Sequence, residues 1–311
     1  MHTFPDGKKF AFTVFDDTDN STVANVGAVY QLLEELGMRT TKSVWPLPNV
    51  PGARFGGGNL CDREYLDWVL NLQEKGFEIA LHNVRNSDSP RDIVEQGFAE
   101  FEKRIGKRPR IHANHSSNRE NIYWGEARLS AGEVRLCYNL ATRFRKSGCF
   151  LGHVPSSEFF WGDICHEKVD YVRNFVFNEI NLDNVNPLMP YYDPSRSFVK
   201  AWFSSCEGAR VESFCQTLAE RNQEKLEAEG GVCIMYTHFA VGFCNGKLHP
   251  RFEELMRRLS QRKGWFVPVS TLLDFLRSEH PEHTISRKAL AGMERRWFLE
   301  KAHLAHVVNS K

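Results

Sequence analysis

Acidic and histidine side chains stand at the ends of four strand-like apolar runs in this sequence. They are Asp16 and Asp17 after one run, His82 after the next, His112 and His115 around a third, and His238 after a late one. Carboxylates and imidazoles together suit Zn²⁺ and similar divalent ions, and a cation would offset the repulsion between the two adjacent carboxylates. If these strands are neighbours in a β/α barrel, their ends converge, so the sequence predicts a metal or acid–base site there.

Each of these signals also has an ordinary structural explanation. An Asp pair after a strand is common in turns and helix caps, and Asp19 is expected to cap the helix that follows it. A lone histidine in an apolar run more often packs in a core, and this chain has 12 histidines to place. The repetition at four strand ends is therefore what favours a shared site.

Strand-like runs alternate with helix-like segments along most of the chain. Strands are expected at 8–15, 39–45, 77–82, 110–113, 147–154, 171–177, 197–205, 231–238 and 265–270. Helices are expected at 21–37, 62–76, 89–109, 211–230, 249–264, 271–279 and 286–307. This alternation predicts a mainly parallel sheet covered by helices, and the strand count favours a distorted (β/α) barrel of about seven strands. We expect one domain over residues 1–285, followed by an amphipathic C-terminal helix and tail at 286–311.

Composition excludes several classes of protein. The chain has 40 Lys and Arg against 39 Asp and Glu, so its charge gives no argument for nucleic-acid or anionic-membrane binding. No apolar run reaches the roughly 18 residues of a membrane span. Eight cysteines form no CxxC pair, and "MHTFPDGKKFAF" lacks the order of a signal peptide. These observations predict a cytoplasmic protein.

The residues at these strand ends resemble the motifs of the polysaccharide deacetylase family, the NodB-homology enzymes of carbohydrate esterase family 4. "TVFDD" (13–17) is similar to the family's first motif, "GFEIALH" (76–82) to its second, and "CIMYTHF" (233–239) to its last. "GKRP" (106–109) resembles the segment that often precedes the third motif. Order and rough spacing hold over residues 8–275.

The resemblance implies a barrel of the NodB type and a role for each matching residue. Asp16 would be the general base that deprotonates the attacking water, and His238 the general acid that protonates the leaving group. Asp17 and His82 would bind one divalent metal ion, with zinc expected first and cobalt or nickel as alternatives.

The chain departs from the family pattern at the third ligand. The family has a second histidine four residues after the first, and this position is Asn86 here. His115 is expected to replace it, with Asn86 and His112 as less favoured alternatives. The family's arginine beside the catalytic base is also missing from its expected place, and Arg143 or Arg196 are candidates to supply it.

The resemblance predicts a hydrolase that removes an acetyl group from an acetamido sugar or a sugar precursor used in surface polysaccharide synthesis. In the cytoplasm the substrate would be a small acetylated sugar, a nucleotide sugar or a lipid-linked saccharide. Trp161, Tyr192 and Trp202 are candidate stacking residues for sugar rings.

Two other functions compete with this one. "VFDDTDNST" is also similar to the start of haloacid-dehalogenase phosphatases, in which Asp17 would be the nucleophile, Asp19 the acid–base partner and Mg²⁺ the metal. The altered motifs also allow a catalytically inactive, sugar-binding relative of the deacetylases.

Overall fold

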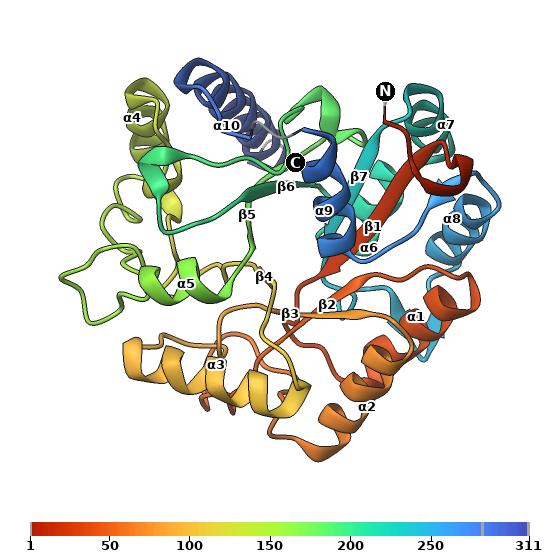
Figure 1. Cartoon of the computed structure of the whole chain (residues 1–311), viewed down its shortest axis with the longest axis horizontal. Helices are drawn as coiled ribbons and strands as arrows, with labels where there is room; N and C mark the ends of the chain where they lie inside the picture. Colours follow the sequence, from red (N-terminus) through yellow and green to blue (C-terminus); the bar gives the residue numbers. More distant parts are fainter. Residues whose placement is uncertain (1, 281–282, 310–311) are drawn as a thin grey trace.

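Seven parallel strands close into a barrel in the computed structural model, which describes residues 2–280 and 283–309 (Figure 1). They are β1 (Phe10–Asp16), β2 (Thr41–Val44), β3 (Glu78–Leu81), β4 (Ile111–His112), β5 (Tyr171–Phe177), β6 (Trp202–Cys206) and β7 (Val232–Thr237). Each strand pairs with the next in chain order, and β1 pairs with β7 to close the ring. The predicted (β/α) barrel of about seven strands is confirmed.

The barrel is distorted beside β1. The short strand β10 (Gly264–Trp265) pairs with the start of β1, at Phe10 and Ala11, whereas β2 pairs only with its end, at Phe15 and Asp16. Every residue of β1 is buried, as expected for a strand covered on both faces. A small antiparallel hairpin, β8 (Cys244–Asn245) and β9 (Lys247–Leu248), lies outside the barrel sheet.

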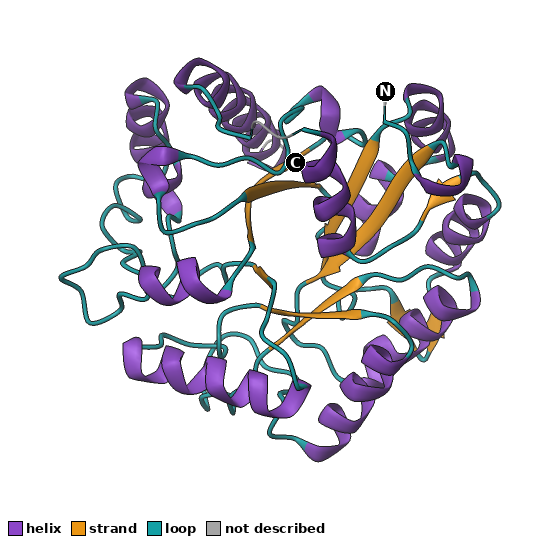
Figure 2. Cartoon of the chain, in the orientation of Figure 1, coloured by secondary structure: helices purple, strands orange, loops and turns teal. Residues whose placement is uncertain are grey.

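Helices surround the strands (Figure 2). The α-helices are α1 (Val23–Glu35), α2 (Arg63–Glu74), α3 (Arg91–Ile105), α4 (Gly132–Ala141), α5 (Gly162–Lys168), α6 (Val211–Thr217), α7 (Glu220–Glu229), α8 (Pro250–Ser260), α9 (Val269–Glu279) and α10 (Arg287–Asn309). Four short 3₁₀ helices are η1 (Pro5–Gly7), η2 (Gly125–Arg128), η3 (Leu182–Asn184) and η4 (Pro194–Arg196). Within the described residues, no helix is both long and apolar enough to cross a membrane.

Three expected elements differ from the structure. The strand expected at 265–270 includes only Trp265, because α9 already begins at Val269. The segment 147–154 is not a strand, because it folds as turns against another loop, with the Leu151 amide donating to the Arg119 carbonyl over 2.6 Å. The helix expected over 211–230 is two helices, since Ala219 between α6 and α7 has extended backbone angles.

The C-terminal helix α10 packs against the barrel. It contacts α4 and β5, and Figure 1 shows it beside α4 at the edge of the barrel. Its Glu294 is fully buried and accepts hydrogen bonds from the amides of Ser130 (2.7 Å) and Ala131 (2.8 Å). This carboxylate therefore ties α10 to the segment that leads into α4.

A buried ion pair joins the first two strands. The Lys42 ammonium lies 2.9 Å from Asp16 Oδ2, and both side chains are fully buried. The Tyr30 hydroxyl donates to Asp16 Oδ2 (3.0 Å) and the Phe239 amide donates to Oδ1 (2.9 Å). Burial would lower the pKa of Lys42, but the Asp16 carboxylate outweighs it and raises that pKa, so Lys42 stays a cation.

Replacing Lys42 by Met should destabilise the protein strongly, because it leaves the Asp16 carboxylate buried without its cation. We expect a loss of about 3–5 kcal/mol in the free energy of unfolding, measured by urea denaturation. The double variant Lys42→Met/Asp16→Leu should recover part of that loss. Arg63→Met, which breaks the exposed pair with Asp67, is the control and should unfold like wild type. A Lys42→Met protein as stable as this control would contradict the structural role of the pair.

Candidate metal and catalytic site

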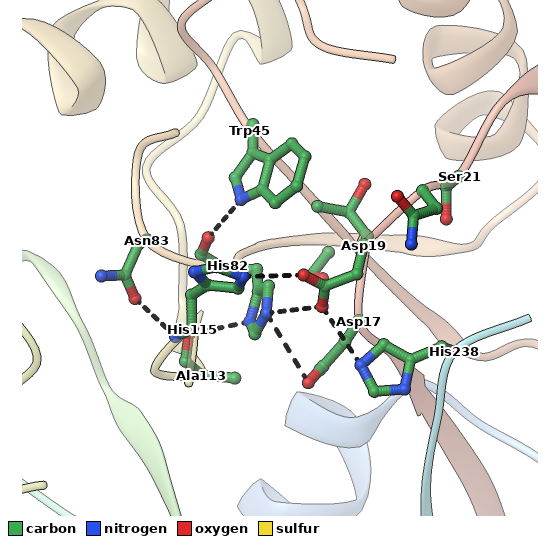
Figure 3. Close-up of polar contacts among 12 residues, drawn as sticks. Asp17, Asp19, Ser21, Trp45, His82, Asn83, Ala113, His115 and His238 are labelled. Carbon is green, nitrogen blue, oxygen red and sulfur yellow. Dashed lines mark hydrogen bonds and ion pairs between the residues drawn. The ribbon is translucent and has the colours of Figure 1, made fainter. Parts of the chain in front are cut away.

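Five polar side chains from different strands meet at the carboxyl end of the barrel (Figure 3). They are Asp17 and Asp19 after β1, His82 after β3, His115 after β4 and His238 after β7. The convergence follows from the parallel barrel, in which all strands end at the same face. The structure thus brings together four of the residues singled out from the sequence, and it adds Asp19 at their centre.

Asp19 is the carboxylate that the histidines share. Its Oδ1 lies 2.8 Å from Nε2 of His115, and its Oδ2 lies 3.1 Å from Nε2 of both His82 and His238. Burial would raise the pKa of Asp19, but His82 and hydrogen bonds from the three histidines outweigh it and lower that pKa. The carboxylate is therefore ionised and points into a ring of imidazole nitrogens.

A tight turn after β1 gives Asp19 this position. The Ser21 amide donates to the Thr18 carbonyl, and Asn20 has a left-handed φ of 58°. The loop around Gly57 packs on this turn so closely that a Cβ at Gly57, whose φ is 124°, would lie 2.7 Å from the Ser21 carbonyl oxygen. The expectation that Asp19 caps α1 is wrong, because Thr22 is the capping residue and accepts from the Asn25 amide.

The outer nitrogens of two histidines are held by acceptors. Nδ1 of His82 lies 3.1 Å from the Ala113 carbonyl, and Nδ1 of His115 lies 2.7 Å from Oδ1 of Asn118. The Asn118 amide nitrogen donates to Ser87 O and to Glu120, so its oxygen is the atom that faces His115. Both Nδ1 atoms must therefore carry a proton, so Nε2 is the nitrogen of each ring that faces Asp19 and that would offer its lone pair to a metal ion once deprotonated.

These donors fit a divalent metal ion. Asp19, His82 and His115 each offer a ligand atom, all within 4.8 Å of one another. Asp19 Oδ1 and His115 Nε2 are buried and, among the described residues, have no hydrogen-bond partner of good geometry. One carboxylate and two imidazoles with fixed outer hydrogen bonds are a donor set typical of zinc sites that keep an open position.

Asp17 lies beside this set and is held by an arginine from β5. Arg173 donates from Nη1 to Oδ1 (2.8 Å) and from Nη2 to Oδ2 (2.6 Å) of Asp17, a bidentate pair that is almost fully buried. Burial would raise the pKa of Asp17, but Arg173, with His82 and His238, outweighs it and lowers that pKa. Asp17 Oδ2 is also 3.8 Å from His82 Nε2, so this carboxylate borders the candidate metal position.

His238 completes the group from the end of β7, the strand that pairs with β1. Its Nδ1 lies 3.1 Å from the Ala209 carbonyl and must carry a proton, while its Nε2 faces Asp19. Burial would lower the pKa of His238, but Asp19 and Asp17 outweigh it and raise that pKa. The protonated imidazolium is thus favoured at this position, and its side chain is 17% exposed, which leaves it open to the cavity.

Asp16 does not lie at this site, so its expected role as general base needs correction. Its carboxylate is fully buried, and both oxygens are occupied by Lys42, Tyr30 and the Phe239 amide. Side chains alternate in direction along β1, so Asp16 and Asp17 point to different sides of the strand. Asp17, expected as a metal ligand, instead lies beside the candidate metal position. Asp19 is the carboxylate that offers a ligand atom together with His82 and His115.

The alternative third ligands also lie elsewhere. Asn86 uses its amide to accept from the Val50 amide and to donate to the Phe55 carbonyl, and so holds a loop in place. His112 packs on Trp161, with ring centroids 4.9 Å apart, and burial lowers its pKa to about 3. The expected arginine is Arg173 rather than Arg143 or Arg196, and the sequence signal for it is one charged residue inside the apolar run of β5.

A cavity of about 640 Å³ opens over the site, and its lining includes Asp17, Asp19, His82 and His238. Its aromatic lining consists of Phe55, Trp124, Tyr236 and Trp297. The stacking residues expected from the sequence are not among those lining residues: Trp161 and Trp202 are buried, and Tyr192 pairs through its backbone with His283 and Thr284. A larger hollow of about 950 Å³, lined by Glu126, Arg196 and Arg295 among others, contains none of the site residues.

Comparison with known proteins gives only distant structural neighbours. No family model matches the chain, and no curated protein matches it. Solved structures similar to it include one assigned as a polysaccharide deacetylase from Mycobacterium smegmatis, at 10% identity and a TM-score of 0.49, covering 92% of this chain and 96% of the other. Puue allantoinase matches at 12% identity and a TM-score of 0.49, over 89% and 93% of the two chains.

A third neighbour is the peptidoglycan deacetylase PdaC of Bacillus subtilis, at 11% identity and a TM-score of 0.42, over 89% of this chain and 95% of the other. Similarity at this level carries no argument about activity, so the function has to be argued from the side chains of the site. Polysaccharide deacetylases, which this chain resembles in the order of its motifs, are among the solved structures similar to it.

Proposed function

We propose that this protein is a metal-dependent hydrolase that removes an acetyl group from an acetamido sugar or a sugar precursor. The observation that carries the proposal is the donor set of Asp19, His82 and His115, which lies directly beside the arginine-held Asp17 and beside His238. Hydrolysis of an amide needs an activated acyl carbonyl, a base for the attacking water and an acid for the amine that leaves. The cavity offers one group or set of groups for each.

Asp19, His82 and His115 would hold the ion, with zinc expected first and cobalt or nickel as alternatives. Mg²⁺ prefers oxygen ligands, so the two imidazoles favour the zinc-like ions. When bound, such an ion supplies Lewis-acid polarisation of the acyl carbonyl and lowers the pKa of a water molecule.

Asp17 is the residue best placed to accept the proton of the attacking water. The two hydrogen bonds from Arg173 keep its carboxylate ionised and fix its orientation toward the ligand set. A carboxylate with a lowered pKa is a weak base. It can deprotonate a water molecule only when the pKa of that water is also lowered. Base and metal ligand thus come from one turn, at Asp17 and Asp19.

His238 would give its proton to the leaving group. Its Nδ1–H is fixed on the Ala209 carbonyl, and Asp19 and Asp17 favour the protonated ring, so a proton is available at Nε2 on the cavity side. The same groups would serve an acetyl ester, since only the basicity of the leaving atom differs. The substrate we propose is a small acetylated sugar, a nucleotide sugar or a lipid-linked saccharide, used in the synthesis of a surface polysaccharide.

The phosphatase alternative is less well supported. It requires Asp17 to attack phosphorus through one oxygen, yet both oxygens of this carboxylate are bonded to Arg173. It also requires Asp19 as an acid–base partner of Asp17, whereas Asp19 is surrounded by three histidines. The inactive sugar-binding alternative is less well supported, because His115 would supply the ligand that Asn86 does not.

The ligand assignment predicts metal content. Purified wild-type protein should hold about one zinc-like ion per chain, measured by elemental analysis, and Asp19→Asn and His115→Asn should each lose most of it. Asn86→Ala should keep its metal and lose only stability, because Asn86 supports a loop. Retention of metal by His115→Asn together with its loss in Asn86→Ala would reverse the assignment. A wild-type protein that takes up no zinc, cobalt or nickel would favour the inactive binder.

The base assignment predicts different effects on turnover when either of the two adjacent aspartates is replaced. Asp17→Asn and Asp16→Asn should both be less stable than wild type, because each leaves a buried cation, Arg173 or Lys42, without its carboxylate. Per folded, metal-loaded molecule, Asp17→Asn should release acetate at least 10²-fold more slowly, because a general base contributes about 10²–10⁴-fold. Asp16→Asn should keep near-normal turnover on the same basis. Acetate release from a panel of N-acetylated sugars and nucleotide sugars, at matched metal content, is the measurement. Full activity in Asp17→Asn would show that another group takes the proton.

A further inference from the structure

A buried arginine that pairs with no carboxylate among the described residues lines the cavity over the site. Arg128 is the last residue of η2, its side chain is 7% exposed, and it borders the same cavity as Asp17, Asp19 and His238. None of the sequence motifs pointed to it. It takes no part in the proposed hydrolytic step.

Two tryptophans hold the guanidinium. Its central carbon lies 3.6 Å from the ring centroid of Trp124 and 4.9 Å from that of Trp297. Both rings also line the cavity. Cation–π contact of this kind stabilises the charge and orients the plane of the group, but it leaves the N–H donors without acceptors.

Those donors have no acceptor in the described part of the chain. Arg128 makes no ion pair or hydrogen bond with the side chains or backbone that the structure describes, and its Nε is buried and unsatisfied. Burial lowers the pKa of Arg128 to about 10, with Tyr138 opposing this shift and Arg173 adding to it. The group is therefore still a cation at neutral pH, and an unpaired buried cation is costly.

The surroundings fix Arg128 rather than letting it move to solvent. Glu294 of α10 accepts from the amides of Ser130 and Ala131, two and three residues after Arg128. Trp297 lies one turn further along the same face of α10 and packs on the guanidinium. The C-terminal helix thus holds both the backbone and the side chain of Arg128 in position.

Charge around the cavity also favours an anion. Its three carboxylates are matched, with Asp17 on Arg173, Asp19 on the histidines and Glu207 on Lys301 (3.0 Å). The remaining charged lining residues are Arg54, Arg128 and Arg210, and no ion pair is formed by any of them within the described residues. The lining of the cavity therefore carries more positive than negative charge, while the negative charge of Asp19 in the ligand set is matched by the histidines.

We propose that Arg128 binds an anionic group of the substrate, a carboxylate or a phosphate, and so selects charged acetylated sugars over neutral ones. This inference rests on the proposed deacetylase function and names its substrate class. A planar guanidinium held between two indole rings presents its N–H edge in one direction, which matches the two oxygens of a carboxylate or phosphate. Arg128 is a binding residue in this proposal, and the chemistry remains with Asp17, His238 and the ligand set.

Three probes that share one sugar test the proposal. N-acetylglucosamine is neutral, N-acetylglucosaminuronic acid adds a carboxylate, and N-acetylglucosamine 1-phosphate adds a phosphate. Their dissociation constants would be measured by calorimetry on zinc-loaded protein, with acetate release followed in parallel. Wild type should bind at least one anionic probe roughly 10- to 100-fold more tightly than the neutral one, the range expected for hydrogen bonds to a charged group. The probe that is preferred identifies the anion.

Two variants separate binding from structure. Arg128→Met keeps an apolar side chain between the rings and should abolish the preference for the anionic probe, without a lower melting temperature, since it removes an unpaired buried charge. Arg145→Met, an exposed arginine outside the cavity, is the matched control and should behave like wild type. An Arg128 that is merely structural would instead give a less stable variant with unchanged discrimination.

The outcomes also distinguish this inference from the function on which it rests. Equal binding of the three probes by wild type, or binding of none at millimolar concentration, overturns the anion site. Acetate release that is equally fast from the neutral probe supports the deacetylase and overturns the anion site alone. Anion-selective binding that Arg128→Met removes, with no acetate released from any probe, supports the anion site and counts against deacetylation.

Discussion

The site depends on how three buried carboxylates in one short segment are each matched to different positive groups. Asp16 is paired with Lys42 inside the wall of the barrel, Asp17 with Arg173 at its mouth, and Asp19 with three imidazoles above it. Buried carboxylates this close would repel one another and be costly without compensation. The separate partners compensate each carboxylate locally, and they lower the pKa of Asp17 and of Asp19.

The pair of Asp16 with Lys42 supports the fold, whereas Asp17 and Asp19 line the cavity over the site. Lys42 and Asp16 join β1 to β2 at the place where β10 has taken up the other part of that edge of β1. Once this pair fixes the end of β1, the turn that follows carries Asp17 and Asp19 to the mouth of the barrel. Helix α10, which is far from these residues in the sequence, completes the lining of the cavity with Trp297 and Lys301.

Much of the fold and part of the site could be predicted from the sequence. Alternating strand and helix patterns led to the barrel, and histidines at strand ends led to His82, His115 and His238. It was harder to predict which aspartate of "FDDTDN" has which role, because the family motif places the base and the metal ligand at adjacent residues. In the assignment proposed here they are two residues apart, at Asp17 and Asp19, and Asp16 is buried in the core. Arg128 carried no sequence signal, since a basic residue in a polar loop is ordinarily exposed.

The sequence by itself therefore determined the alternation of strands and helices, the polar residue types at the strand ends and the absence of a strong net charge, because these follow from local periodicity and residue type. Only the tertiary structure decided which carboxylate faces which cation. That choice depends on the direction of each side chain across strands and on partners 26 to 219 residues away, such as Lys42, Arg173 and His238. It also decided that Arg128 is buried between Trp124 and Trp297, because burial arises from packing of the C-terminal helix and not from the residues beside Arg128 in the chain.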